Sequence, residues 1–200
     1  MTERFDRAAE NWDKGDMRRF IAESVFQTIA SRIALLGHMD ILDFGCGTGL
    51  LGFRIAPQVR SVTGVDLSEK MLEQAAAKNT PHLRMEVVRA DLINEPLERM
   101  FDGIVSSMAM HHVDDTGALF RAFRKHLKRD GFVAVADLDA EDGTFHSHGN
   151  EGVHHLGFDR EKLRETIEET GFSNVRFHTA CTVEKEGKKY PVFLVTATKL

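Results

Sequence analysis

The chain has 200 residues, of which 42% are hydrophobic, and both values are typical of one globular domain. Its net charge of −5, without a Lys/Arg-rich stripe, argues against a large nucleic-acid footprint, and no run approaches the ~20 apolar residues of a membrane span. Cys46 and Cys181 are too few and too far apart for a disulfide framework or a thiolate metal cluster, and the N-terminal segment is charged where a signal peptide would be apolar, so we expect a cytoplasmic protein.

The N-terminal segment predicts two helical pieces. The stretch from Phe5 to Asp13, FDRAAENWD, is polar apart from Phe5 and Trp12 as its large apolar residues. Farther on, apolar residues recur at helical spacing until Gly37 offers a stop: Phe20, Ile21, Val25, Ile29, Ile33 and Leu36. This spacing predicts one helix whose apolar face packs on the core.

From Asp40 onward, short apolar runs alternate with helical patterns. The expected strands are 41–44, 62–65, 83–88, 103–106 and 132–136, and the expected helices lie before Pro57, after Ser68 and over 116–128. A breaker at Asp130-Gly131 separates the last of these helices from the strand that follows. The alternation favours an α/β fold with a doubly wound, mostly parallel sheet, in which the carboxyl ends of the strands share one edge.

The end of the chain has a different pattern. Residues 137–157 show little periodicity, and a structureless connection of that length favours a functional loop. Asp159 then caps a helix that Gly171 stops. Two apolar runs, 175–183 and 191–198, flank a turn over 186–189 and predict a C-terminal antiparallel hairpin that closes the sheet.

The stretch ILDFGCGTG, residues 41–49, places an apolar run and Asp43 before three alternate glycines, Gly45, Gly47 and Gly49. Alternate glycines allow an unusual turn and let a ligand lie directly against the main chain. The sequence therefore predicts a bound small molecule. The spacing of Gly47, Gly49 and Gly52 also matches the G-x-G-x-x-G of dinucleotide sites, so the glycines alone leave the cofactor open.

Three further polar sites follow at the ends of predicted strands. Asp66 ends the run RSVTGVDL about 20 residues after the glycines, where an acid can accept both hydrogen bonds of a ribose diol. Ala90-Asp91-Leu92 follow the third strand, and Ser106-Ser107 follow the fourth. With this order of motifs, the chain resembles the class I S-adenosylmethionine-dependent methyltransferases from about Phe5 to its end.

The resemblance implies a single domain over residues 1–200 with a Rossmann-like, seven-stranded sheet, in which 1–37 form an N-terminal lid and helix and 38–200 form the core. It implies S-adenosylmethionine as the cofactor, with S-adenosylhomocysteine as the product. The implied cofactor-binding residues are Phe5, Trp12, Asp43, Gly45, Cys46, Gly47, Gly49, Asp66, Leu67, Met71, Ala90, Asp91, Leu92, Ser106, Met108 and His111. The alternative for the segment FDRAAENWD is a helix packed on the sheet edge.

Histidines are the candidates for acceptor chemistry. His111 and His112 follow the fourth strand, while His146, His148, His154 and His155 lie in the long loop. We predict His111, His154 and His155 as catalytic residues, because an imidazole can deprotonate an acceptor near neutral pH. The alternatives are a hydrogen-bonding role for His111 and a solvated polar loop for the others. We expect no metal site, because the ligand spacing is unconvincing.

The chain carries no Asn-Pro-Pro-Tyr type motif after the fourth strand, which favours a small-molecule acceptor over a base or a glutamine amide. The expected function is methyl transfer to that acceptor. Two other functions stay open: an NAD-dependent oxidoreductase, supported by the glycine spacing and Asp66, and a cofactor-binding protein without catalysis. The acceptor and the oligomeric state are not predicted.

Overall fold

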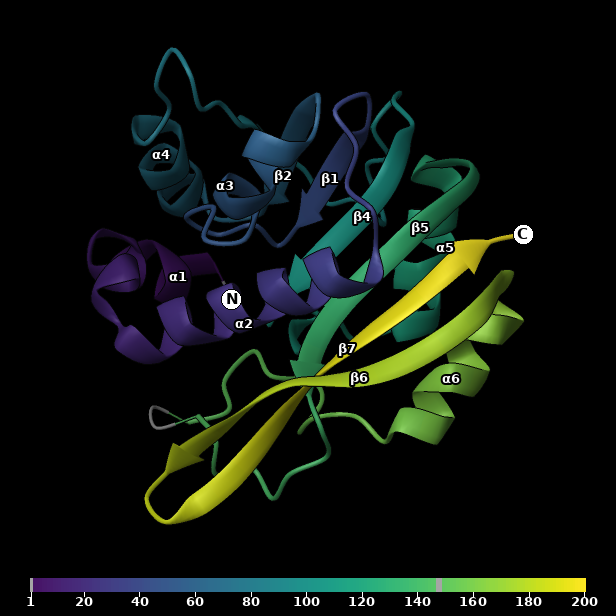
Figure 1. Cartoon of the computed structure of the whole chain (residues 1–200). Coiled ribbons are helices and arrows are strands. Elements are labelled where there is room, and N and C mark those ends of the chain that lie inside the picture. Colours follow the sequence, from purple (N-terminus) through teal and green to yellow (C-terminus); the bar gives the residue numbers. More distant parts are fainter. Residues whose placement is uncertain (1, 147–148) are drawn as a thin grey trace.

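The computed structural model describes residues 2–146 and 149–200. Its centre is a seven-stranded sheet with the order β3-β2-β1-β4-β5-β7-β6. The strands are β1 (Asp40–Phe44), β2 (Ser61–Asp66), β3 (Glu86–Arg89), β4 (Phe101–Ser107), β5 (Leu127–Leu138), β6 (Phe172–Lys185) and β7 (Lys188–Lys199). The first five pair in parallel, whereas β7 runs antiparallel to both β5 and β6 (Figure 1). The predicted mostly parallel sheet with a C-terminal antiparallel hairpin is confirmed.

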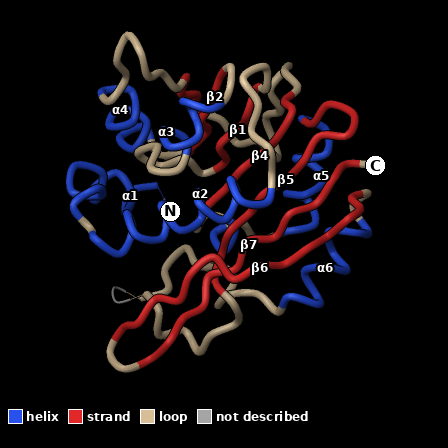
Figure 2. The backbone as a smooth tube through the Cα atoms, viewed as in Figure 1, coloured by secondary structure: helices blue, strands red, loops and turns tan. Residues whose placement is uncertain are grey.

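Helices cover both faces of this sheet (Figure 2). They are α1 (Thr2–Ala8), η1 (Ala9–Lys14), α2 (Asp16–Arg32), α3 (Gly52–Ile55), η2 (Ala56–Gln58), α4 (Glu69–Ala77), η3 (Met110–His112), α5 (Thr116–His126) and α6 (Arg160–Glu169). One core contains buried residues of α2, α3 and α4, and the other contains those of α5 and α6. Neighbouring strand residues alternate between these two cores: Ile41 packs into the first and Leu42 into the second. Among the described residues, no helix is long and apolar enough to cross a bilayer.

Side chains cap two helix starts, of which the one at Asp159 was expected. The Ser68 hydroxyl accepts a hydrogen bond from the Met71 amide at the start of α4. The Asp159 carboxylate accepts from the amides of Glu161 and Lys162 at the start of α6. Each cap satisfies amides that the first helical turn leaves without an internal partner.

The expected core-facing helix is shorter than its apolar spacing indicated. The helix α2 ends at Arg32, and Ile21, Val25 and Ile29 form its buried face. Phe20 and Leu36 are 51% and 44% exposed, so their expected burial was wrong. Phe20 precedes Ile21 by one residue, which turns its side chain about 100° away from the buried face, and Leu36 lies beyond the helix.

The expected breaker at Asp130-Gly131 does not end an element. The strand β5 runs through it, because Asp130 adopts a left-handed backbone conformation with φ 59°. The pairing with β4 shifts register at this point, between Phe101 and Gly103. Asp130 therefore marks a bulge inside a long strand, as turn residues commonly do in sheets.

The final hairpin turns more tightly than expected. The strands β6 and β7 meet at Glu186-Gly187, and both residues have positive φ, 53° and 77°. A two-residue turn of this kind matches the right-handed twist of the paired strands. The hairpin projects past the body of the sheet, beside the loop that follows β5 (Figure 1).

Candidate active site

A cavity of about 770 Å³ opens at the carboxyl ends of β1, β2 and β4. The helical segments α1 and η1 supply part of its wall, together with the loops after β1, β3 and β4. Its volume falls in the range of small-molecule sites. The position agrees with the general rule that open α/β sheets bind ligands where neighbouring strands diverge.

The glycine turn supplies bare main chain to this cavity at Gly47. That residue has φ +52°, and a Cβ added there would meet only the Met71 sulfur at 4.0 Å, so the adjoining space is free for a ligand. Gly45 and Cys46 also line the cavity. Gly49 does not: a Cβ there would lie 2.7 Å from Phe53 and 2.8 Å from Met85. The geometry therefore does not support the predicted contact of Gly49 with the cofactor, because this glycine allows close packing behind the turn.

Asp66 stands at the end of β2 and lines the same cavity. Its Oδ2 accepts from the Gly47 amide at 2.8 Å, and its Oδ1 accepts from the Ser68 amide at 2.9 Å. Burial raises the pKa of this carboxyl, and the amide hydrogen bonds oppose the rise. Each oxygen has lone pairs left for a ligand hydroxyl.

Asp91 forms the second acidic site of the cavity wall. Its Oδ1 accepts from the Ile93 amide at 3.1 Å, and its Oδ2 accepts from the Asn94 side-chain amide at 2.8 Å. These bonds fold the loop after β3 around the carboxylate. The side chains of Leu67, Met71, Ala90, Leu92 and Met108 also line the cavity, as the resemblance implied.

Asp43 is the buried acid below the glycine turn. It is 1% exposed, and its Oδ2 lacks a hydrogen-bond partner among the described residues. Burial raises the pKa of Asp43 to about 7, and the nearby Asp66 carboxylate adds to the rise. An orphaned buried carboxylate oxygen beside a cavity suits a cationic ligand group such as the ammonium of S-adenosylmethionine.

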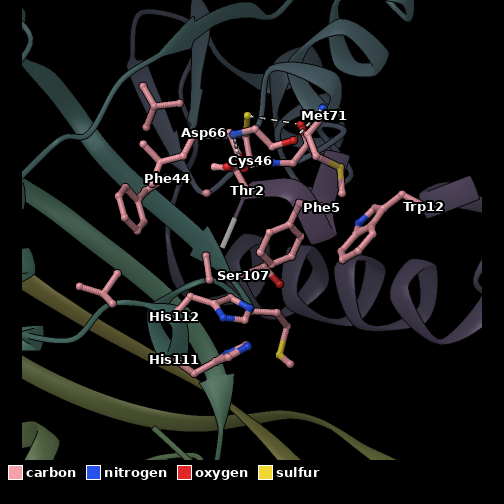
Figure 3. A pocket seen from close by; sticks show the side chains of 18 of the residues that line it. Thr2, Phe5, Trp12, Phe44, Cys46, Asp66, Met71, Ser107, His111 and His112 are labelled. Atoms are coloured by element: carbon pink, nitrogen blue, oxygen red, sulfur yellow. Dashed lines mark hydrogen bonds between the residues drawn. The ribbon is translucent and has the colours of Figure 1, made fainter. Parts of the chain in front are cut away.

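Ser106 does not contribute to the cavity, which corrects the sequence prediction. Its side chain is fully buried, and its hydroxyl donates to the Phe44 carbonyl at 2.9 Å. The next residue, Ser107, lines the cavity instead (Figure 3). Consecutive strand residues point to opposite faces, so a one-residue difference decides which serine meets the ligand.

The N-terminal segment, α1 and η1, forms part of the cavity wall and is called the lid below. Phe5 and Trp12 both line it, with their rings edge to face at 5.8 Å. Asp6 accepts from the Ser68 hydroxyl at 2.6 Å, and Asp13 accepts from the Thr48 hydroxyl at 2.5 Å. Asp13 also pairs with Lys78. These contacts hold the lid to the glycine turn and to the start of α4.

His111 lies at the opposite end of the cavity from Asp66 (Figure 3). It is 2% exposed, and its Nδ1 lies 2.8 Å from Oδ1 of the fully buried Asp137. The Asp137 Oδ2 accepts from the His111 backbone amide at 3.0 Å, so both oxygens hold the histidine. In the neutral ring, Nδ1–H donates to this carboxylate, which leaves Nε2 with a free lone pair. Nε2 is buried and has no hydrogen-bond partner among the described residues.

Two more imidazoles surround His111. The ring centroids of His112 and His146 lie 4.1 Å and 5.1 Å from it, and both residues line the cavity. The His112 Nδ1 donates to the Gly152 carbonyl at 2.6 Å, and Phe5 packs on its ring at 5.1 Å. Burial and the neighbouring His111 lower the pKa of both His112 and His146 to about 4. His112 and His146 are therefore both neutral at physiological pH.

His154 and His155 do not reach the cavity, so their predicted catalytic role is not supported by the geometry. The His155 Nε2 donates to the carbonyls of Val113 and Asp114 at 3.0 Å, and His154 Nδ1 lies 3.4 Å from an Asp114 carboxylate oxygen. Their backbone amides donate to the His111 carbonyl at 2.9 Å and 3.2 Å. Both residues thus help to fix the backbone of His111 on the side away from the cavity.

His148 lies outside the described residues. Within residues 2–146 and 149–200, no group of three or more His, Cys, Asp or Glu side chains is arranged to hold a metal ion. Sequence reasoning also missed Asp137 as a site residue, although the available signal was the one used for Asp66: an acid directly after an apolar strand.

The fold and the cavity are typical of an α/β nucleotide-cofactor site. A glycine turn follows β1, the acid Asp66 ends β2 at the position where such sites bind a ribose, and the last strand is antiparallel. The comparisons with known proteins name the family. A family model described as a methyltransferase domain matches residues 41–131. The resemblance to the class I S-adenosylmethionine-dependent methyltransferases is thereby confirmed.

Curated relatives of this chain are also named as methyltransferases. An uncharacterised methyltransferase of Schizosaccharomyces pombe is 35% identical over 153 residues, which cover 68% of this chain and 54% of that protein. A ubiquinone biosynthesis O-methyltransferase of Pelagibacter ubique is 29% identical over 68% of this chain and 63% of its own length. The chain thus spans about half the length of the first curated relatives that it matches.

Solved structures share the fold. A DhpI–SAH complex superposes with a TM-score of 0.78 at 16% identity and covers 99% of this chain and 94% of its own. The Haemonchus contortus phosphoethanolamine N-methyltransferase 2, in complex with S-adenosyl-L-methionine, reaches 0.71 at 18% identity, over 98% of this chain and 60% of its own. At such identities the likeness establishes the architecture, including the β7 strand between β5 and β6.

Proposed function

We propose that this protein transfers a methyl group from S-adenosylmethionine to a small organic acceptor whose hydroxyl or N–H group is deprotonated by His111. The cofactor supplies a methyl group already activated on a sulfonium. The protein then has to hold the reactants in line, exclude water and remove the acceptor proton where the acceptor needs it.

The acidic end of the cavity fits the cofactor. Asp66 accepts from the ribose hydroxyls with the lone pairs that its backbone contacts leave free, and Asp91 accepts from the adenine amine. The bare main chain at Gly47 lies against the amino-acid part, and Asp43 offers its unpartnered oxygen to the ammonium. These roles come from the family resemblance, and the hydrogen-bonding capacity of each residue supports them.

The observation that carries the proposal is the His111–Asp137 pair. Asp137 orients the ring by accepting from Nδ1–H, which leaves Nε2, in a residue that lines the cavity, without a competing partner among the described residues. A histidine held this way takes a proton from the acceptor while Asp137 stabilises the resulting imidazolium. Hydrolase triads orient a histidine by the same electrostatic principle.

Burial under the lid supports a small acceptor over a macromolecular one. Nε2 of His111 lies in a residue that is 2% exposed, and Phe5 of the lid packs against the adjoining His112. A residue of a protein or nucleic acid would have to pass this lid to reach the base. The P. ubique relative, named as an O-methyltransferase in ubiquinone biosynthesis, is consistent with a small acceptor.

Two binding and turnover measurements test the proposal. Calorimetry should detect S-adenosylhomocysteine and no NAD, because the glycine that completes the dinucleotide spacing, Gly52, is buried against Met85 and Val62. Incubation with fractionated metabolite pools and S-adenosylmethionine should then yield a product heavier by one methyl group. Tight NAD binding without S-adenosylhomocysteine binding would favour an oxidoreductase, and cofactor binding without any methylated product would favour a protein that has lost catalysis.

A further inference from the structure

The two ends of the cavity differ in charge. Three lining carboxylates, those of Asp43, Asp66 and Asp91, gather at the cofactor end. At the histidine end the lid contributes Arg4, which lines the cavity beside His146 and Glu151. Arg4 belongs to α1, and His146 and Glu151 belong to the loop between β5 and α6.

Arg4 has an incomplete set of partners. Its Nη1 donates to the Glu151 backbone carbonyl at 3.4 Å, and within the described chain no carboxylate oxygen lies within 4.0 Å of its guanidinium. Arg160, another arginine close to the sheet, contrasts with it, since Asp139 accepts two of its hydrogen bonds at 2.7 Å and 2.8 Å. A guanidinium offers five donors in a fork that fits a carboxylate or a phosphate, so most of the capacity of Arg4 is unused.

Arg4 lies near a second cation, Arg18. The charge of Arg4 contributes to the lowered pKa of Arg18, and it also disfavours protonation of His146. Arg18 has its own partners, because it stacks on the Trp12 ring at 3.9 Å and donates to the Trp12 carbonyl at 3.1 Å. A ligand anion at Arg4 would offset this repulsion and accept hydrogen bonds from the unused N–H groups of its guanidinium.

We propose that the methyl acceptor carries an anionic group, a carboxylate or a phosphate-type oxyanion, that pairs with Arg4 while the group to be methylated meets Nε2 of His111. This inference rests on the proposed function, because it describes the acceptor of that same site. Arg4 thereby sets acceptor specificity, and the lid that carries it closes over the cavity when the anion is bound.

The test uses full-length protein saturated with S-adenosylhomocysteine and three ring probes: 4-hydroxybenzoate, phenyl phosphate and the neutral 4-hydroxybenzamide. Aromatic probes suit a wall built from Phe5, Trp12 and Phe44. Calorimetry should show at least one anion binding roughly tenfold or more tightly than the amide, as expected for charge-assisted pairing. The stronger of the two anions identifies the carboxylate or the phosphate as the preferred group.

Variants assign the preference to one side chain. Arg4→Gln should abolish it, Arg4→Lys should retain part of it, and the matched control Arg129→Gln, which removes a positive charge from a fully solvated side chain, should leave it unchanged. Equal binding of amide and anions, absence of anion binding, or a preference that survives in Arg4→Gln overturns the proposal.

The cofactor measurements keep the two proposals apart. Arg4→Gln should bind S-adenosylhomocysteine as the wild type does, and a tenfold loss there would mean that Arg4 serves the cofactor, which also overturns the inference. Failure of the wild type to bind S-adenosylhomocysteine at all would instead refute the proposed function.

Discussion

The cofactor end and the histidine end of the cavity are built in different ways. At the cofactor end, Asp91 is held by residues two and three positions along the chain, and Asp66 receives one of its two hydrogen bonds from Ser68. At the histidine end, His111 depends on Asp137, 26 residues away, and His112 on Gly152, 40 residues away. One end is formed mainly by turns after strands, and the other is assembled from four separate parts of the chain.

This difference has an electrostatic counterpart. Burial raises the pKa values of Asp43 and Asp66 at the cofactor end, and backbone amides oppose that rise, whereas burial keeps His112 and His146 neutral. In Figure 3, Phe5 of the lid lies between Asp66 and the rings of His111 and His112. The cavity thus has carboxyl groups at one end and imidazoles at the other, and the measurements below test whether the two ends can be disturbed independently.

The largest expected effect concerns turnover at the histidine end. Replacing His111 by Ala should reduce turnover of the acceptor found in the metabolite screen by about 10²- to 10⁴-fold, the usual contribution of a general base. Asp137→Asn should also lower turnover, because it no longer stabilises the imidazolium. The affinity for S-adenosylhomocysteine should stay within about twofold in both variants, as measured by calorimetry.

His155→Gln is the control for that pair, since its ring points away from the cavity toward the carbonyls of Val113 and Asp114. It should retain most of the turnover. Full activity in a folded His111→Ala protein would remove the general base from the mechanism, and a parallel loss of cofactor affinity would mean that the two ends are not independent.

The next effect concerns affinity at the cofactor end. Asp66→Asn should weaken S-adenosylhomocysteine binding by ~1.5–3 kcal/mol, roughly 10- to 150-fold, because it removes charge-assisted hydrogen bonds to the ribose. Asparagine keeps one oxygen, which can accept from Gly47 or from Ser68 but not from both, so it disturbs the turn less than alanine would. Calorimetry measures the change, and Glu73→Gln on the exposed side of α4 is the control. An unchanged dissociation constant in the folded variant would mean that Asp66 only shapes the turn.

A smaller effect concerns the dependence of stability on pH. The folded pKa of His112 is lowered to about 4 from an ordinary 6.5, so the unfolded chain binds more protons between these values. The contribution of His112 to stability should therefore be complete above pH 6.5 and be lost as the pH drops toward 4, by about 1–3 kcal/mol after allowance for partial exposure of the ring.

Chemical denaturation across this pH range gives the slope, and His112→Gln should flatten it. The neighbouring groups that titrate or carry charge are His111, His146 and Asp137, so the variant is compared with wild type at each pH. An identical slope in the two proteins would place the pH dependence elsewhere.

The smallest effect concerns the lid that joins the two ends. Trp12 is the sole tryptophan of the chain, so its emission reports on η1 without interference. Saturating S-adenosylhomocysteine should shift that emission, because a ligand in the cavity dries the ring that lines it. Asp6→Ala, which removes the contact to the Ser68 hydroxyl, should reduce the shift. Emission that ignores the ligand in wild type would leave the segment as a fixed part of the wall.

Sequence and structure agree best where the signal is local. The order of strands and helices, the caps at Ser68 and Asp159, and the position of Asp66 follow from apolar periodicity and from residue types at strand ends. Where the predictions were wrong, a shift of one or a few residues decided the outcome: Ser107 faces the cavity in place of Ser106, and Gly49 packs against Phe53. Side-chain direction at the end of a strand depends on register, which periodicity defines only to within a residue or two.

By itself, the sequence determined the doubly wound architecture, the glycine turn and the acids beside it, because each depends on backbone conformation and on neighbours a few residues away. Only the tertiary structure decided which histidine meets the cavity. His111 lines the cavity and is held by Asp137, at the end of the adjacent strand β5, which accepts a hydrogen bond from the His111 Nδ1–H. His154 and His155 lie outside the cavity lining, and their backbone amides donate to the His111 carbonyl. Such pairings depend on how strands and loops distant in sequence are brought together, and burial in the sheet makes them specific.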